Sequence, residues 1–153
     1  MTSLMEAAAE VAQMVSDNAM LYYRKTIDVD VKTDGSPVTI ADRTSEQKAR
    51  DWIERKFPDD GIFGEEAGKT KPDAKRQWII DPIDGTKAFV RAVPFWGSLV
   101  AVVEGDLLEV LERRLDLRAV ELQRTGDPLV VVLRAGQTQD EVEPVLREVL
   151  GDG

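Results

Sequence analysis

Two segments of the chain carry apolar residues at the three- and four-residue spacing of an amphipathic helix, over residues 3–25 and 42–56. Ser3 and Glu6 fit a capping box at the start of the first helix, and Pro58 is expected to stop the second. The residues that the second helix is expected to bury share its apolar face: Ala49, Trp52, Ile53 and Phe57. The pattern therefore predicts two helices packed on a common hydrophobic core.

Shorter segments follow the alternating pattern of β-strands. Apolar and polar residues alternate over 27–31, turn-forming residues occupy 34–37, and 38–40 can return as a partner strand, which predicts a β-hairpin. Three further strands, a polar loop and a short helix are expected: strands over 61–64, 77–80 and 95–104, the loop over 68–76 and the helix over 86–91. Helices packed on an antiparallel sheet make an α+β domain.

The chain after Gly105 differs in composition from the part before it, because it is dominated by Leu, Arg, Glu and Val. It carries no apparent chemical motif. Its predicted elements run helix, strand, strand, helix: 106–116, 118–123, 129–133 and 139–150. We therefore divide the chain into residues 1–104 and an α-β-β-α tail, residues 105–153. The tail is expected to complete the core or to form an interface.

Composition narrows the chemistry that is open to this chain. The 153 residues include neither cysteine nor histidine, which excludes disulfides, thiolate metal sites and nucleophilic triads that need histidine. Acid–base chemistry would then rest on carboxylates, lysines or water bound to a metal. The formal net charge of −9 disfavours nucleic acid and anionic membranes as partners. No signal peptide or segment of membrane-spanning length is found, so a cytoplasmic location is expected.

The segment WIIDPIDGT places two aspartates after an apolar run. Pro82 fixes one backbone dihedral and Gly85 permits a sharp turn, so Asp81 and Asp84 can point to one side. Their carboxylates and an intervening carbonyl suit a hard cation such as Mg²⁺. Thr86 follows at a predicted helix start, where its hydroxyl and free amides can meet an anion or a water. The alternative is that the aspartates only form a turn and cap the helix.

Further acidic residues at the ends of predicted strands favour the metal hypothesis over the turn. Glu65 and Glu66 follow the strand over 61–64, Asp42 follows the second hairpin strand, and Lys32 lies in the hairpin itself. Carboxylates gathered in one place repel one another unless a cation compensates them. A metal site would explain the clustering.

These residues resemble the signature motifs of the inositol monophosphatase family of Mg²⁺-dependent, lithium-sensitive phosphatases. Three motifs match in order and spacing within residues 1–104: KTDGSPVTIAD from Lys32, GEE from Gly64 and WIIDPIDGT from Trp78. The segment KAFVRAVPFW that follows is most similar to the bacterial histidinol-phosphate phosphatases. The resemblance implies the N-terminal half of the sugar-phosphatase fold. It also implies hydrolysis of a small phosphate monoester such as histidinol phosphate or inositol phosphate.

The same resemblance implies which residues bind the metal. Glu65 and Asp81, with the carbonyl of Ile83, would hold a first Mg²⁺, and Asp81 and Asp84 would share in a second. Glu66 is not expected to bind a metal directly, because the family uses the first glutamate of this pair.

The resemblance also implies how the reaction would be carried out. Thr86, paired with Asp42, would polarise the water that attacks phosphorus, and the amides of Gly85 and Thr86 would steady the phosphate. One cation would lower the pKa of bound water, and the other would stabilise the leaving alkoxide. Lys32 would lie in the family's mobile segment, which is associated with an optional further metal.

The chain departs from the family in its C-terminal half. Family members are longer, and that half supplies another metal-binding aspartate in a Trp-Asp-x-Ala-like motif, which this sequence lacks. Three hypotheses follow. The chain is a compact phosphatase with a weaker metal site, or it is an inactive metal-binding remnant that is truncated, chimeric or engineered. In the third hypothesis the tail is an interaction module that binds a partner or forms a homodimer.

Overall fold

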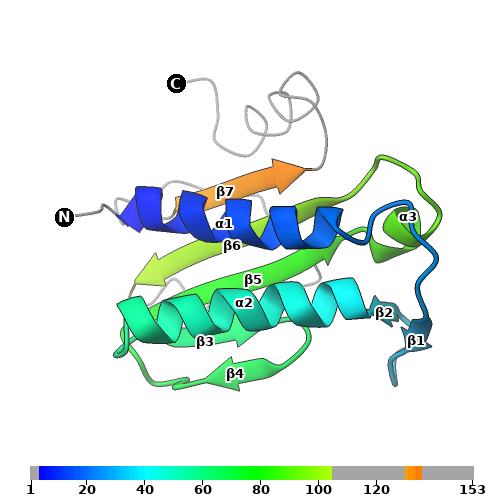
Figure 1. Ribbon diagram of the computed structural model, residues 1–153. Coiled ribbons are helices and arrows are strands. Elements are labelled where there is room, and N and C mark those ends of the chain that lie inside the picture. The colour runs from blue at the N-terminus through cyan, green and yellow to red at the C-terminus, as the bar shows by residue number, and fades with distance from the viewer. Residues whose placement is uncertain (1–3, 105–129, 136–153) are drawn as a thin grey trace, which may run out of the picture.

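The computed structural model describes residues 4–104 and 130–135 (Figure 1). Its elements, in chain order, are α1 (Leu4–Met20), β1 (Val29–Val31), β2 (Pro37–Thr39), α2 (Ile40–Lys56), β3 (Gly61–Gly64), β4 (Gly68–Thr70), β5 (Arg76–Asp84), α3 (Thr86–Val90), β6 (Gly97–Glu104) and β7 (Val130–Ala135). Within these two ranges, no helix has both the length and the apolar character needed to cross a membrane. Ser3 and the elements predicted over 106–116, 118–123 and 139–150 lie outside the described residues.

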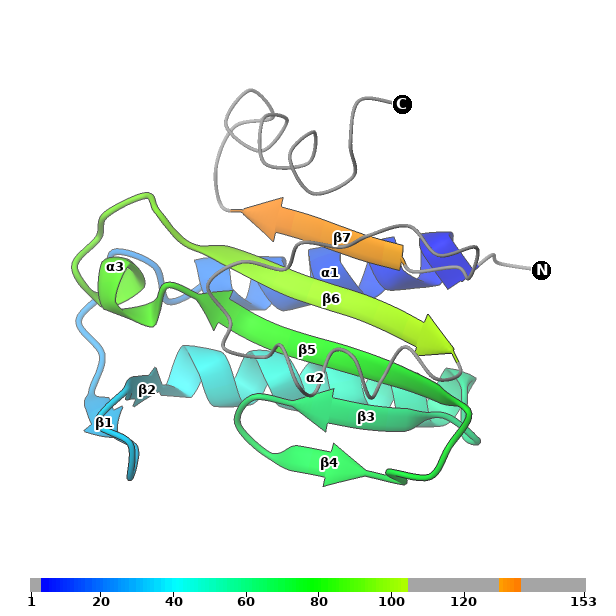
Figure 2. The ribbon, with the colours of Figure 1, turned by 180° about the vertical axis from the view of Figure 1, so that it is seen from behind.

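Five strands form one mixed sheet in the order β4-β3-β5-β6-β7. α1 and α2 both lie on one face of this sheet, as the front and rear views show (Figures 1 and 2). The predicted α+β fold, with helices packed on a sheet, is therefore confirmed. The sheet is mixed rather than wholly antiparallel, because the chain reverses into β4 and again before β5, which makes β3 and β5 parallel. β7 pairs with β6 and includes most of the strand predicted over 129–133.

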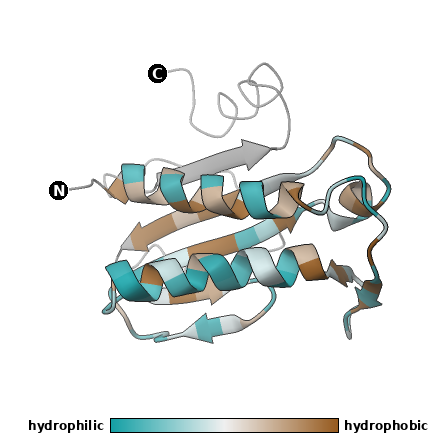
Figure 3. Ribbon diagram, in the orientation of Figure 1, coloured by the Kyte–Doolittle hydropathy of each residue, from teal (hydrophilic) through white to brown (hydrophobic). Residues whose placement is uncertain are grey.

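The main hydrophobic core lies between the two helices and the sheet. Its members come from α1, α2, β3, β5 and β6, and they include Trp52, Ile53, Ile62, Trp78 and Val100. Figure 3 shows the same division, with apolar strands behind the helices and a largely polar outer surface on α2. The burial of Ala49, Trp52 and Ile53 is as predicted, and Phe57 is partly buried against the core.

The β1–β2 hairpin and the start of α2 follow from local sequence. The two strands pair antiparallel, and the Asp34 carboxylate accepts hydrogen bonds from the backbone N and the hydroxyl of Ser36 at 2.9 and 2.6 Å. α2 begins two residues before the predicted Asp42, because the Thr39 side chain accepts a hydrogen bond from the amide of Ala41 at 3.1 Å. The carboxylate of Asp42 in turn accepts from the backbone N and the hydroxyl of Thr39, which completes a capping box.

The first helix is shorter than its apolar pattern predicts. α1 ends at Met20 rather than near residue 25, and the chain turns at once, with the amide of Tyr22 donating to the carbonyl of Ala19. The turn brings the Tyr23 ring to 5.5 Å from the ring centroids of both Phe89 and Trp96. Aromatic packing from distant parts of the chain therefore ends a helix that local spacing would continue.

Two predicted boundaries in the sheet are wrong. The loop expected over 68–76 contains β4, a short edge strand that pairs with β3. β5 does not end before Asp81 but continues through Pro82 to Asp84, with a register shift against β6 between Asp81 and Asp84. Proline is tolerated there because the ladder is irregular at that point, and the Pro82 carbonyl accepts a hydrogen bond from the hydroxyl of Ser98 at 2.7 Å.

Candidate functional site

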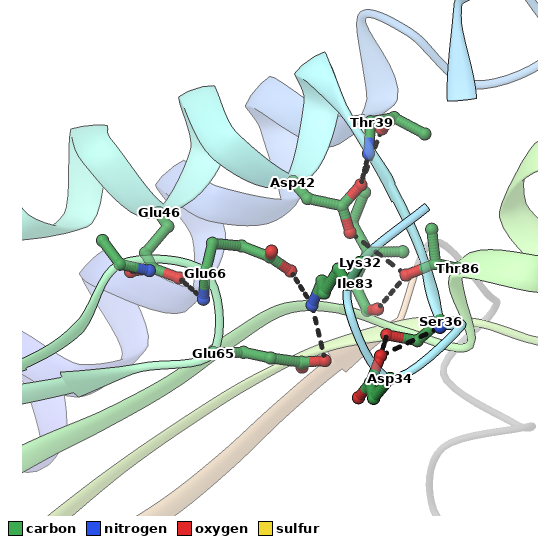
Figure 4. Close-up of polar contacts among 11 residues, drawn as sticks. Lys32, Asp34, Ser36, Thr39, Asp42, Glu46, Glu65, Glu66, Ile83 and Thr86 are labelled. Atoms are coloured by element: carbon green, nitrogen blue, oxygen red, sulfur yellow. Dashed lines mark hydrogen bonds and ion pairs between the residues drawn. The ribbon is translucent and has the colours of Figure 1, made fainter. Parts of the chain in front are cut away.

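The candidate site lies where β3 and β5 end side by side, facing the start of α2 and the β1–β2 hairpin (Figure 4). The parallel register puts Gly64 opposite Ile80, and the amide of Glu65 donates to the carbonyl of Ile80 at 3.0 Å. Glu65, which directly follows β3, and Asp81, which lies within β5, are therefore neighbours on adjacent strands. This pairing between distant segments brings two of the three carboxylates predicted to bind metal to the same end of the sheet.

Gly85 makes the link between β5 and α3 and has a left-handed backbone, with φ of 87°. A Cβ atom at this position would lie 2.7 Å from the carbonyl oxygen of Phe95. Both the dihedral and the close approach require glycine. This turn places Thr86 immediately beyond the two aspartates.

Asp81 is the most perturbed acid of the site. Its side chain is almost fully buried, with 7% of the residue exposed, and its Oδ1 atom has no hydrogen-bond partner. Burial, first of all, and then the adjacent Glu65 and the charges of Asp84 and Asp42 together raise the pKa of Asp81 to about 9. An uncompensated carboxylate among other carboxylates is an arrangement that a cation would stabilise.

Asp84 and Glu66 show the same tendency more weakly. The pKa of Asp84 is raised, chiefly by the partial burial of its carboxylate and secondly by the negative charge of Glu65. Partial burial also raises the pKa of Glu66, although the hydrogen bond and charge of Lys32 oppose that effect. The negative charges of the site are therefore held together at a free-energy cost.

Lys32 is the cation that approaches these acids from the hairpin. Its ammonium lies 3.3 Å from Oε1 of Glu65 and 2.9 Å from Oε1 of Glu66 (Figure 4). Partial burial alone would lower the pKa of Lys32, but the hydrogen bonds and charges of the two glutamates outweigh it, so the pKa of Lys32 is raised. The ammonium compensates the glutamates and leaves Asp81 Oδ1 without a partner.

Thr86, Asp42 and Ile83 come together on the other side of the site. The Thr86 hydroxyl lies 3.1 Å from Oδ1 of Asp42 and 3.0 Å from the carbonyl of Ile83. Oδ2 of Asp42 is held at the start of α2 by Thr39, so the carboxylate has a fixed orientation. Because one hydroxyl proton serves one acceptor at a time, Thr86 keeps a lone pair with which to accept a hydrogen bond from water.

The chemistry of these residues suits a metal ion, but their present arrangement does not form a complete metal site. Oxygen donors, an orphaned buried acceptor and gathered negative charge suit a hard cation such as Mg²⁺. Within residues 4–104 and 130–135, however, no three acidic side chains form a ready metal cluster. Glu65 is instead turned toward Lys32. The chemistry of the donors fits a divalent cation, and binding would require Glu65 to exchange its lysine partner for the metal.

Sequence analysis did not find two buried residues beside the site, Glu46 and Arg50. The Glu46 carboxylate accepts hydrogen bonds from the amides of Glu66 and Ala67, at 2.6 and 3.0 Å, and from Nε of Arg50 at 2.9 Å. A signal was present, because residues 42, 46 and 50 are spaced four apart and share one face of a helix. It was missed because charged residues on a helix are usually solvated.

Comparison with known proteins places the chain in a family. The model of the inositol monophosphatase family matches residues 1–110. The chain belongs to this family. The resemblance inferred from the three motifs is therefore confirmed.

Individual relatives match only part of their own length. A histidinol-phosphatase from Chlorobaculum parvum is 44% identical over 107 residues, which cover 69% of this chain and 41% of that protein. A histidinol-phosphatase from Mycobacterium tuberculosis is 53% identical over 76 residues, or 50% of this chain and 29% of that protein. Among solved structures, an inositol monophosphatase from Zymomonas mobilis matches with 43% identity and a TM-score of 0.53, over 65% of this chain and 38% of that chain. The chain thus spans less than half the length of these relatives.

Proposed function

We propose that the chain is a Mg²⁺-dependent phosphomonoesterase that acts on a small phosphate monoester such as histidinol phosphate or inositol phosphate. The observation that carries the proposal is Asp81, a buried carboxylate with an unpaired oxygen beside Glu65, Asp84 and Asp42. A group of acids that destabilises the folded chain is expected where a cation is used in function. Family membership and the histidinol-phosphatase relatives favour phosphate monoesters as substrates.

In this proposal four residues hold the metal. Glu65, Asp81 and Asp84 would contribute carboxylate oxygens, and Ile83 its main-chain carbonyl, which now lies near the Thr86 hydroxyl. When bound, Mg²⁺ would supply a Lewis acid that activates water and neutralises charge on the phosphate. Asp81 would lose its proton in the process, since a metal-bound carboxylate is ionised.

The chain's own acid–base group would be the pair of Asp42 and Thr86. Asp42 would hold the Thr86 hydroxyl by accepting its proton in a hydrogen bond, leaving the Thr86 oxygen to accept from the attacking water. The Asp42 carboxylate would then be the final acceptor for the proton that water releases. The amides of Gly85 and Thr86 are predicted to hold the phosphate, as the family resemblance implies.

The decisive experiment measures phosphate release from histidinol phosphate and from inositol phosphate as Mg²⁺ is titrated. We expect Mg²⁺-dependent turnover that Asp84→Asn removes and that Asp59→Asn, an exposed aspartate outside the site, leaves intact. Absence of turnover by the unmodified chain at every Mg²⁺ concentration would reject the proposed activity.

A metal-binding chain without turnover is the second candidate. It is favoured by the lack of a ready three-acid cluster among the described residues and by the short span of the relatives that the chain covers. Calorimetry and the phosphate assay together would identify it. The unmodified chain would then bind Mg²⁺ without releasing phosphate, and Asp81→Asn would abolish the binding. A cytoplasmic location and a homodimer remain predictions from sequence.

A further inference from the structure

A buried ion pair on α2 lies behind the turn that carries Glu65. The side chains of Glu46 and Arg50 are 1% and 6% exposed, and Nε of Arg50 donates to Oε1 of Glu46 at 2.9 Å. Removing two charges from water is expensive unless other hydrogen bonds satisfy them. A pair buried this deeply is therefore expected to perform a specific task, and its remaining contacts show which one.

Those contacts all go to the main chain of the β3–β4 turn. The two carboxylate oxygens of Glu46 accept from the amides of Glu66 and Ala67, at 2.6 and 3.0 Å. The guanidinium of Arg50 donates to the carbonyl of Gly68. The pair therefore determines the path of the chain immediately after Glu65.

Gly64 leaves the space that this arrangement needs. A Cβ atom on Gly64 would collide with the Glu46 carboxylate and with the Arg50 guanidinium. The motif Gly-Glu-Glu thus has a physical explanation at its first position. Glycine admits the buried carboxylate, and the carboxylate then holds the two amides that follow Glu65.

The Glu65 side chain is only partly buried. It is 37% exposed, and the cation beside it is Lys32, which comes from the separate β1–β2 hairpin. Its main-chain amide is bound to Ile80 on one side, and the following residues are bound to Glu46 on the other. Asp42 lies one helical turn before Glu46, so α2 also relates Glu65 to the Asp42–Thr86 pair.

We propose that Glu46, supported by Arg50, is a positioning residue that sets the place of Glu65 relative to Asp81 and thereby determines metal affinity. The inference rests on the proposed function, since it requires that Glu65 and Asp81 bind a cation. Hydrogen-bonded residues behind metal ligands typically change metal affinity about 10- to 100-fold when they are removed. Glu46 differs from them only in acting through the main chain.

The test is Mg²⁺ affinity by titration calorimetry on the full chain, with Glu46→Gln as the variant. Glutamine keeps the shape but presents an amide NH₂ group to partners that are all donors, so one main-chain contact must be lost. We expect Mg²⁺ binding about 10- to 100-fold weaker than in the unmodified chain. Thermal denaturation of each metal-free protein records the loss of stability separately.

Asp60→Asn is the matched control. Asp60 is also a buried acid that accepts from an arginine, but it lies at the other end of β3. A loss of stability without a loss of affinity is expected there. If Glu46→Gln behaves like Asp60→Asn, with Mg²⁺ affinity within about twofold of the unmodified chain, the positioning role is overturned.

Two further outcomes are distinguishable. If the unmodified chain binds no Mg²⁺, the proposed function itself fails. If Glu46→Gln does not fold, Arg50→Lys replaces it, because lysine keeps the charge but lacks the planar fork that reaches both Glu46 and Gly68. The same affinity criterion then supports or overturns the positioning role.

Discussion

The two ends of the parallel β3–β5 pair each contain a buried aspartate, and the two aspartates differ in whether their carboxylates have partners. At the start of the strands, Asp60 accepts hydrogen bonds from Nε of Arg76 and Nε1 of Trp78, both at 2.7 Å. At the finish, Asp81 has an unpaired Oδ1 and acidic neighbours. The two aspartates are equally buried, at 6% and 7% exposed.

The difference separates an acid that stabilises the fold from one that the fold tolerates. Asp60 gains a cation and an indole N–H, so its charge is compensated where it is buried. Asp81 gains neither, and its pKa rises to about 9 through burial and then through its acidic neighbours. Burial alone would not have distinguished them, whereas the identity of the partners does.

Asp81→Asn should produce the largest effects. Mg²⁺-dependent phosphate release should fall at least about 100-fold, since the central ligand is lost. The metal-free protein should meanwhile gain about 1–3 kcal/mol in free energy of unfolding at pH 7, because Asp81 must take up a proton to fold at this pH and asparagine need not. Phosphate assays and chemical denaturation measure the two effects. A variant that loses stability would show that the acids at this end are structural.

Asp60→Asn should have the reverse pattern. The free energy of unfolding should fall by about 2–3 kcal/mol, because Arg76 and Trp78 lose a charged acceptor. Mg²⁺ affinity should change by less than about twofold, since the change lies at the far end of the strands. Denaturation and calorimetry on one preparation test both parts. A large change in affinity would contradict the division between the two ends.

Asp81 should make the stability of the metal-free protein depend on pH. The folded-state pKa of Asp81 lies above its unfolded value, so the folded chain binds more protons. Stability of the metal-free protein should therefore fall as pH rises from about 4 toward 9. Asp81→Asn should flatten this slope, as measured by thermal denaturation in a chelator. An unchanged slope in the variant would assign the effect to other groups.

Lys32→Met should give the smallest effect. Its ammonium must leave Glu65 before that carboxylate can bind a metal, and a partly exposed ion pair contributes about 0.5–1 kcal/mol. Removing it should strengthen Mg²⁺ binding about two- to fivefold in calorimetry. Weaker binding would mean that Lys32 supports the metal site rather than competing for it.

The local parts of the fold could be predicted from the sequence. Helical spacing predicted α2 with its buried Trp52 and Ile53, and alternation with a turn predicted the hairpin. These elements depend on neighbouring residues in the chain. The Thr86 hydroxyl contacts Asp42, the pairing that the family resemblance implied, and it also contacts the carbonyl of Ile83, which was not expected. The roles of these residues remain predictions.

The features that depend on distant contacts were not predictable in the same way. β4 contains Gly68-Lys69-Thr70, which has no hydrophobic alternation, and it is a strand only because β3 lies beside it. α1 stops early because Tyr23 packs on Phe89 and Trp96. Glu46 was overlooked because its four-residue spacing from Asp42 and Arg50 is equally typical of solvated charges on a helix.

The parallel pairing of β3 and β5 has a consequence for how the chain can change in length. β3 and β5 run in the same direction, so both begin at the same end of the sheet. The connection over residues 71–75, which leads into β5, therefore lies at that end, remote from Glu65 and Asp81. The side chain of Gln77 closes this connection by donating to the carbonyls of Lys71 and Ala74. Insertions or a fluorescent label there would alter the loop while leaving the spacing of the acids intact. The connection is therefore the place where the chain can be lengthened or labelled without moving the acids.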